Sequence, residues 1–131
     1  MAKSVTQLVQ AANAVVPRIA AAQAQELIAK GGEAGVLVVD VREASEVQQS
    51  GKVGGAVHVP RGLLEFVADP QSPSHDPRFE TGKPVIVYCA GGGRAALAGQ
   101  ALKEMGYGEV YNLGGFADWA DSGGAVDPAP A

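Results

Sequence analysis

The chain has 131 residues and a formal net charge of −4, a length that suits one domain able to fold without disulfides or a structural metal. The acidic balance argues against a large basic face, so we expect no nucleic-acid partner. With a single cysteine the chain can form no intrachain disulfide, and it has no zinc-type spacing of cysteine and histidine. The N-terminal segment reads neither as a signal peptide nor as a membrane span, and the cysteine has no partner thiol, so we expect a cytoplasmic protein with no membrane partner. We also expect no metal and no cofactor.

Helices and strands are expected to alternate along the chain, with proline, glycine or a polar residue between them. In chain order we expect helices at 3–15 and 20–30, strands at 36–39 and 56–59, a short helix at 63–67, a proline-rich loop at 69–84, a strand at 85–88, a helix at 94–105, a strand at 109–113 and a helical turn at 116–121. The continuous apolar runs are typical of strands that are covered on both faces. The alternation therefore predicts a mainly parallel sheet between two layers of helices.

The cysteine has an unusual setting between an apolar strand and a glycine-rich loop. The loop reads Cys89, Ala90, Gly91, Gly92, Gly93 and Arg94, and the helix at 94–105 follows it. Glycines let the backbone turn several N–H groups toward one sulfur, and the start of a helix adds positive charge. The alternative is a small buried cysteine followed by a flexible turn, which gives no reason for three consecutive glycines. We therefore predict an anion cradle around a nucleophilic thiolate, at the strand ends where parallel sheets bind ligands.

Four segments resemble motifs of the rhodanese family, and they occur in the order typical of that family. They are Val38 to Arg42, Gly51 to Pro60, Tyr88 to Arg94, and Asn112 to Trp119. The resemblance covers residues 17–126 and implies an α/β domain with a five-stranded, mainly parallel sheet flanked by helices on both faces. The remaining residues are interpreted as an N-terminal helical extension at 1–16 and a disordered tail at 127–131.

The resemblance also implies sulfurtransferase activity. In such a cycle the Cys89 thiolate takes a sulfane sulfur from thiosulfate or another persulfide donor and passes it to a thiophilic acceptor, which is cyanide, a small thiol or a protein thiol. Related phosphatases and arsenate reductases have seven-residue loops, whereas the loop from Cys89 to Arg94 has six residues. The count favours sulfur chemistry. The alternative from another class is a noncatalytic module for sulfur relay or protein interaction.

Within this interpretation Cys89 is the catalytic residue, and the substrate-binding residues are Ala90, Gly91, Gly92, Gly93, Arg94 and Arg61. The sequence leaves two positions for the Arg94 side chain, either at the bound anion or pointing outward. It also leaves two for Arg61, in the pocket or on the surface. Glu46 departs from the family pattern, because two-domain thiosulfate enzymes carry a substrate-binding arginine at the corresponding place. A carboxylate there predicts weak affinity for thiosulfate.

Several other polar and aromatic residues are interpreted as structural. We expect Asp40 to accept hydrogen bonds in a turn and Arg42 to form an ion pair or lie on the surface. His58 alternates with two valines, which is typical of a packed or hydrogen-bonded strand histidine. Trp119 and Phe116 are expected to close the core. None of these residues is expected to take part in the chemistry.

Overall fold

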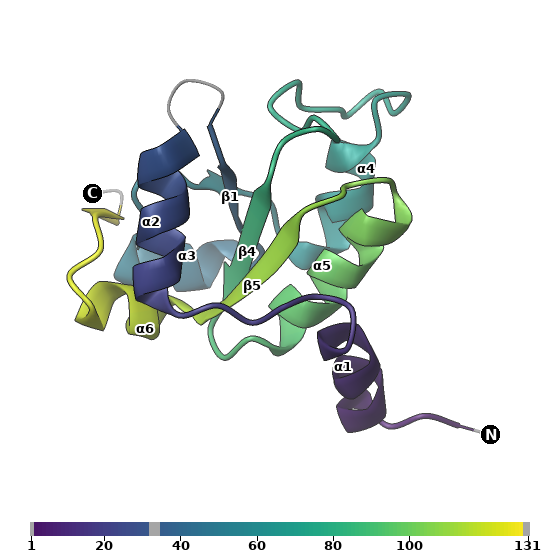
Figure 1. Ribbon diagram of the computed structural model, residues 1–131, viewed down its shortest axis with the longest axis horizontal. Helices are drawn as coiled ribbons and strands as arrows, with labels where there is room; N and C mark the ends of the chain where they lie inside the picture. The colour runs from purple at the N-terminus through teal and green to yellow at the C-terminus, as the bar shows by residue number, and fades with distance from the viewer. Residues whose placement is uncertain (1, 32–34, 130–131) are drawn as a thin grey trace.

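The computed structural model describes residues 2–31 and 35–129, and its centre is a parallel sheet between two layers of helices (Figure 1). The sheet has four strands in the order β3-β1-β4-β5. Their bounds are β1 Leu37–Asp40, β3 Val57–His58, β4 Val85–Cys89 and β5 Val110–Gly115. All three pairings in this sheet are parallel. The expected α/β class is therefore confirmed.

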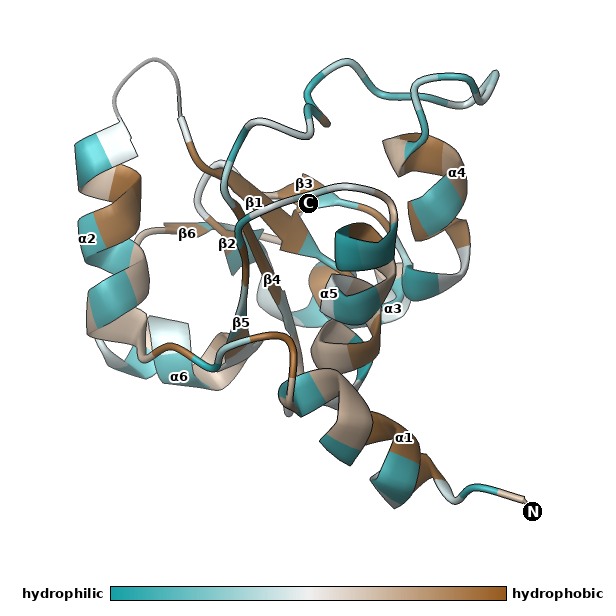
Figure 2. Cartoon of the chain, turned by 45° about the vertical axis from the view of Figure 1, so that its right-hand side comes forward, coloured by the Kyte–Doolittle hydropathy of each residue, from teal (hydrophilic) through white to brown (hydrophobic). Residues whose placement is uncertain are grey.

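The two central strands are apolar along their length because both faces of the sheet are covered. Every residue of β1 and of β4 is buried, and Figure 2 shows both strands largely in the colour of apolar residues. Alternating side chains of these strands enter two separate cores. The continuous apolar runs in the sequence are the direct signature of this arrangement.

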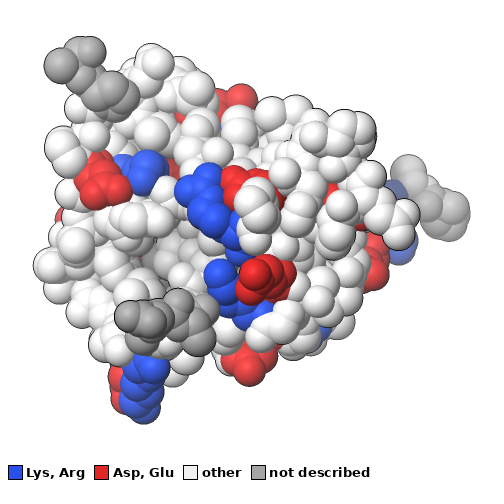
Figure 3. Space-filling view, turned by 90° about the horizontal axis from the view of Figure 1, so that it is seen from above, with Lys and Arg blue, Asp and Glu red and all other residues white. Residues whose placement is uncertain are grey.

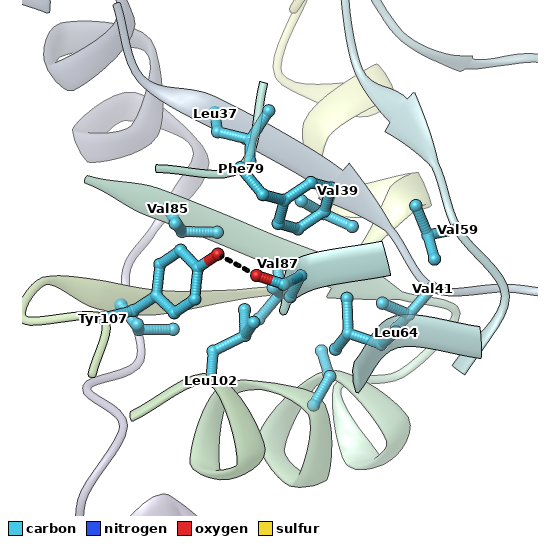
Figure 4. Close-up of a cluster of buried hydrophobic side chains, with 14 of the residues drawn as sticks. Leu37, Val39, Val41, Val59, Leu64, Phe79, Val85, Val87, Leu102 and Tyr107 are labelled. Atoms are coloured by element: carbon cyan, nitrogen blue, oxygen red, sulfur yellow. Dashed lines mark hydrogen bonds between the residues drawn. The ribbon is translucent and has the colours of Figure 1, made fainter. Parts of the chain in front are cut away.

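One helix layer contains α2 (Ala21–Gly31) and α6 (Phe116–Asp121), and α4 (Leu64–Ala68) and α5 (Gly93–Glu104) lie on the opposite side of the sheet (Figure 1). Figure 4 shows the core on the α5 side, where side chains from β1 and β4 meet Leu102 and Tyr107. The buried hydroxyl of Tyr107 donates to the carbonyl of Ala68 over 2.8 Å. The buried hydroxyl group of Tyr107 therefore has a hydrogen-bond partner inside the protein.

Helix α1 (Val5–Asn13) begins at a capping box formed by Ser4 and Gln7, and it packs against α5. Its Ala12 is fully buried, and so is Val16, which follows the helix. A Cβ placed on Gly99 of α5 would lie 2.8 Å from a methyl carbon of Val16. The absence of a side chain at Gly99 lets the N-terminal segment come close to the helix that starts at the cysteine loop.

The prediction of five strands was wrong by one. The outer edge of β5 is occupied by the segment 17–19, which makes a single parallel bridge between Arg18 and Asn112. The N–H of Ile19 donates to the carbonyl of Asn112, and the N–H of Asn112 donates to the carbonyl of Pro17. Proline has no N–H for a further ladder bond, so the bridge does not grow into a strand.

The structure also contains short elements that the sequence analysis did not predict. They are α3 (Ala44–Ser50), β2 (Lys52–Val53), the 3₁₀ turn η1 (Arg61–Leu63) and β6 (Val126–Asp127). Strands β2 and β6 pair antiparallel, and Asp127 accepts a hydrogen bond from Lys52 over 2.9 Å. The tail was expected to be disordered from Asp127, but the pairing extends order to that residue. Residues 130 and 131 of the expected tail lie outside the described residues.

On the face shown in Figure 3, basic and acidic side chains lie next to one another. Ion pairs at the surface include Arg78 with Asp76 and Lys83 with Glu80. This face therefore has no broad patch of one sign. Across residues 2–31 and 35–129, no helix combines the length and the apolar composition that crossing a bilayer demands.

Candidate active site

Cys89 is the last residue of β4, and the cysteine loop (89–94) connects this strand to α5. The cysteine is 1% exposed, whereas Ala90 and Gly91 at the tip of the loop are exposed. The N–H of Gly92 donates to Sγ over 3.0 Å. Negative charge on the sulfur is stabilised by this contact, and the N-terminus of α5 contributes in the same sense.

The loop can reach this geometry because Gly92 adopts a left-handed conformation. Its φ is 101°, and it is the residue that precedes the first turn of α5. Other L-amino acids avoid this region, since their Cβ approaches the following carbonyl. The backbone therefore requires glycine at position 92, whereas Gly91 and Gly93 have no positive φ.

The end of β5 packs directly against the cysteine loop. The register between β4 and β5 shifts after Val87, so that Tyr88 pairs with Gly114 and Cys89 with Gly115. A Cβ on Gly115 would collide with the carbonyl oxygen of Ala90. Gly115 thus allows a close approach to the loop that a side chain at this position would prevent.

Asn112 of β5 holds the cysteine loop in place by a side-chain hydrogen bond. The sequence analysis did not identify this role. The residue is fully buried, and its Nδ2 donates to the carbonyl of Gly92 over 3.0 Å. Its Oδ1 accepts a hydrogen bond from the N–H of Gly114 over 2.8 Å. One side chain therefore holds both glycines that have left-handed backbones beside the cysteine.

Arg94 forms a two-pronged ion pair with Glu46 of α3, with Nη1 to Oε1 at 2.6 Å and Nη2 to Oε2 at 2.9 Å. The hydrogen bonds with Arg94 lower the pKa of Glu46 to about 2. Glu46 in turn raises the pKa of Arg94, and negative charge on Cys89 adds to the rise. Arg94 therefore lies within electrostatic reach of the sulfur, but its donors are engaged by a carboxylate.

Arg61, the other arginine predicted for the site, is also paired. It begins η1, and its Nη1 lies 2.8 Å from Oε1 of Glu65. Within the described residues no hydrogen bond or ion pair joins Arg61 to the cysteine loop.

Gly93, another residue predicted for the site, is the first residue of α5 and lies beside the N-terminal helix. A Cβ placed on Gly93 would lie 3.9 Å from a methyl carbon of Val9.

Asp40 and Arg42 form a buried structural network below the site. The Arg42 guanidinium donates to both carboxylate oxygens of Asp40 and to the carbonyl of Gly51. The Tyr88 hydroxyl donates to Asp40 over 2.6 Å, and burial raises the pKa of Tyr88. Since Tyr88 precedes Cys89, this network fixes the strand end that carries the cysteine.

The other residues interpreted as structural make hydrogen bonds to backbone carbonyls or pack in the core. His58 Nε2 lies 2.7 Å from the carbonyl oxygen of Arg42, a hydrogen bond to the backbone. The indole N–H of Trp119 donates to the carbonyl of Ala125 over 2.7 Å, and the residue is 4% exposed. Phe116 packs against the same core and lies under the Arg42 guanidinium at 4.7 Å.

Solved structures of other proteins are similar to this chain in sequence and architecture. The chain is 36% identical to the protein of unknown function RPA3614 of Rhodopseudomonas palustris CGA009, described as a possible tyrosine phosphatase, with a TM-score of 0.87 over 97% of this chain and 96% of that one. The polysulfide-sulfur transferase homodimer of Wolinella succinogenes has a TM-score of 0.72 at 31% identity, over 92% of this chain and 84% of that one.

The chain is also similar in sequence to curated proteins. The thiosulfate sulfurtransferase GlpE of Coxiella burnetii (strain RSA 331) is 30% identical over 98 residues, which are 74% of this chain and 80% of GlpE. The YqhL protein of Bacillus subtilis is 35% identical over 83 residues, and the match spans 63% of this chain and 59% of YqhL. The family model described as the rhodanese-like domain matches residues 20–122. The chain belongs to the rhodanese-like domain family.

Proposed function

We propose that this protein is a sulfurtransferase that carries a sulfane sulfur on Cys89. The observation that carries the proposal is the N–H of Gly92 donating to Sγ over 3.0 Å, inside a loop that leads into α5. A persulfide places its negative charge one sulfur further out. The exposed loop tip, formed by Ala90 and Gly91, supplies backbone for that position.

The reaction consists of two displacements at sulfur. The Cys89 thiolate attacks the outer sulfur of thiosulfate, the S–S bond of the donor breaks, and sulfite leaves with the electron pair. This step leaves a persulfide anion on Cys89. A nucleophilic acceptor such as cyanide then attacks the terminal sulfur, and the Cys89 thiolate is regenerated with its electron pair. Both steps balance without a metal, an external oxidant or a cofactor.

The names of two similar proteins support a sulfurtransferase activity. GlpE of Coxiella burnetii is named a thiosulfate sulfurtransferase, and the Wolinella protein a polysulfide-sulfur transferase. We infer that the acceptor here is a small nucleophile or a protein thiol. A single cysteine without a disulfide partner fits a reducing compartment such as the cytoplasm.

A phosphatase is the second candidate, because RPA3614 is described as a possible tyrosine phosphatase. The two activities differ in the space that the cradle must provide. A phosphoryl group needs room for a tetrahedron of oxygens around the nucleophile, whereas sulfur transfer adds one atom in line with Sγ. A loop of six residues from Cys89 to Arg94 favours the smaller ligand.

The test is an intact-mass measurement after incubation of the full chain with thiosulfate. We expect the mass to rise by one sulfur atom, the rise to vanish on addition of cyanide, and thiocyanate to appear. The Cys89→Ser variant should show none of these changes, since a serine cannot form a persulfide. Hydrolysis of p-nitrophenyl phosphate without any added sulfur would overturn the proposal in favour of the phosphatase.

A further inference from the structure

Arg18 is a basic residue beside the cysteine loop that has no carboxylate partner in the described parts of the chain. The other arginines around the strand ends are all paired. These pairs are Arg42 with Asp40, Arg61 with Glu65, and Arg94 with Glu46. No hydrogen bond from Arg18 to a protein acceptor is found within residues 2–31 and 35–129 either, and its side chain is exposed. Its guanidinium therefore keeps its donors available.

The backbone around Arg18 is fixed, although the residue lies in the linker between α1 and α2. Arg18 forms the bridge to Asn112, through the hydrogen bonds of Ile19 and Pro17 to that residue. Asn112 is also the residue whose side chain holds the loop carbonyl of Gly92. The position of Arg18 is therefore tied to the loop by one buried residue.

The guanidinium of Arg18 lies across both glycines that Asn112 holds. A Cβ placed on Gly92 would come within 2.9 Å of Nη1, and one placed on Gly114 would lie 2.7 Å from Nε. Both glycines have positive φ, 101° and 91°. Because Gly92 and Gly114 have no side chains, the Arg18 guanidinium can lie against Gly92, whose N–H donates to Sγ of Cys89.

A surface pocket of about 620 Å³ opens beside Arg18, between the start of α2 and α6, and its lining includes no residue of the cysteine loop. Asp118 and Asp121 also line it, and within the described residues neither carboxylate forms an ion pair with Arg18. Charges interact over about 8 Å at physiological ionic strength, so Arg18 attracts an anion at its contact with Gly92 and Gly114, while Asp118 and Asp121 repel an anion from the pocket itself. The small sulfur donors for this family of reactions, thiosulfate among them, are anions.

We propose that Arg18 binds the anionic group of the small sulfur donor, the task that the sequence analysis gave to Arg94 and Arg61. The inference rests on the proposed sulfurtransferase function, and it assigns the donor an anionic group next to its sulfane sulfur. Guanidinium donors match the oxygens of a sulfonate in geometry and charge. Arg94 is held by Glu46, so it competes poorly for the same group.

The test compares two donors that differ by one charge, the thiosulfate dianion and the methanethiosulfonate monoanion. Arg18→Gln should raise the KM for thiosulfate about five- to tenfold and the KM for methanethiosulfonate less, with kcat unchanged for both. Arg18→Lys should keep most of the affinity, because it keeps the charge. The control is Lys103→Gln, which removes an exposed cation from the last turn of α5 that forms no ion pair with any residue the structure describes. It should leave both KM values as in the wild type.

Equal losses for both donors and in Arg18→Lys would overturn the inference and assign Arg18 a packing role. A measurement without turnover separates this outcome from failure of the proposed function. In the Cys89→Ser background, NMR titration with thiosulfate should shift the amides of Gly92 and Gly114, and Arg18→Gln should weaken this binding about five- to tenfold. Unchanged or absent thiosulfate binding refutes the role of Arg18. A wild type that binds thiosulfate but gains no sulfur mass refutes the transferase instead.

Discussion

The side-chain amide of Asn112 donates to the carbonyl of Gly92, and the N–H of the same glycine donates to the sulfur of Cys89. The position of the cysteine loop thus depends on a residue in the neighbouring strand. Asn112 has no solvent exposure, so water cannot replace its hydrogen bonds. Cys89 is the residue proposed to react, whereas Asn112 positions Gly92, whose N–H donates to the cysteine sulfur.

We expect Asn112→Ala to lower the free energy of unfolding by about 1–3 kcal/mol for each buried partner that loses its hydrogen bond. Sulfur transfer to cyanide should fall by more than this loss of stability explains, since the loop loses its anchor. The measurement pairs urea unfolding with the transfer rate. Tyr107→Phe is the matched control, because it removes one buried hydrogen bond, to Ala68, away from the loop. Equal transfer rates in the two variants would contradict the role of Asn112.

Two adjacent glycines of the loop should respond differently to the same substitution. Gly92→Ala forces a Cβ into a backbone with φ 101°, at 2.9 Å from Nη1 of Arg18. A left-handed backbone costs a non-glycine residue about 1–2 kcal/mol, so thermal unfolding should reveal the loss. Gly91 does not have a positive φ, and a Cβ placed on it would meet no atom within 4 Å, so Gly91→Ala should behave as the wild type. A tolerated Gly92→Ala would show that the cradle does not depend on this conformation.

Glu46→Gln should increase kcat/KM for thiosulfate by about three- to tenfold, because the Arg94 guanidinium is no longer neutralised by a carboxylate. The amide can still accept a hydrogen bond from Arg94 and from the N–H of Glu43, so α3 keeps its start. Asp76→Asn removes the same charge from an ion pair with Arg78 in the loop before β4, and it should leave kcat/KM unchanged. A decrease in Glu46→Gln would instead show that the ion pair positions the loop.

The ion pair also predicts how stability depends on acid. Arg94 lowers the pKa of Glu46 from 4.5 to about 2, so the folded state favours the ionised carboxyl. This contribution is present above pH 4.5 and is lost as the pH falls toward 2. Urea unfolding of Glu46→Gln should therefore show a smaller loss of stability over this range than the wild type.

Asp76→Asn should give a similar reduction in acid sensitivity, since Arg78 lowers the pKa of Asp76 to about 2. The effects of the two substitutions should add, because the sites share no partner. A wild-type acid profile in the Glu46→Gln variant would mean that the pair with Arg94 is not maintained in solution.

The central elements could be predicted because their signals are local. The strand expected at 85–88 is β4 (Val85–Cys89), and the helix expected at 94–105 is α5 (Gly93–Glu104). Continuous apolar runs and glycine boundaries are properties of neighbouring residues. The same signals placed Cys89 at the carboxyl end of a strand before a helix, which is the frame of the site.

The partners of the site could not be predicted, because they come from distant parts of the chain. Glu46 lies 48 residues before Arg94, and Asn112 lies 20 residues after Gly92. No spacing rule joins such residues. Arg18 has no local pattern at all, since it lies in a linker. The one available signal was Asn112 itself, a polar side chain inside an apolar strand, which is expected to have a specific hydrogen-bond partner.

The two margins of the central sheet limit how another polypeptide could join it. One margin is β3, which is only two residues long, and the other is covered by the segment 17–19 with its proline. Short edge strands and proline are means by which proteins avoid edge-to-edge aggregation. Over the described residues, the main sheet offers no extended row of free backbone groups at either margin. We therefore expect a polypeptide that exchanges sulfur with Cys89 to be recognised through side chains around the loop, because the main sheet offers it no margin for strand addition.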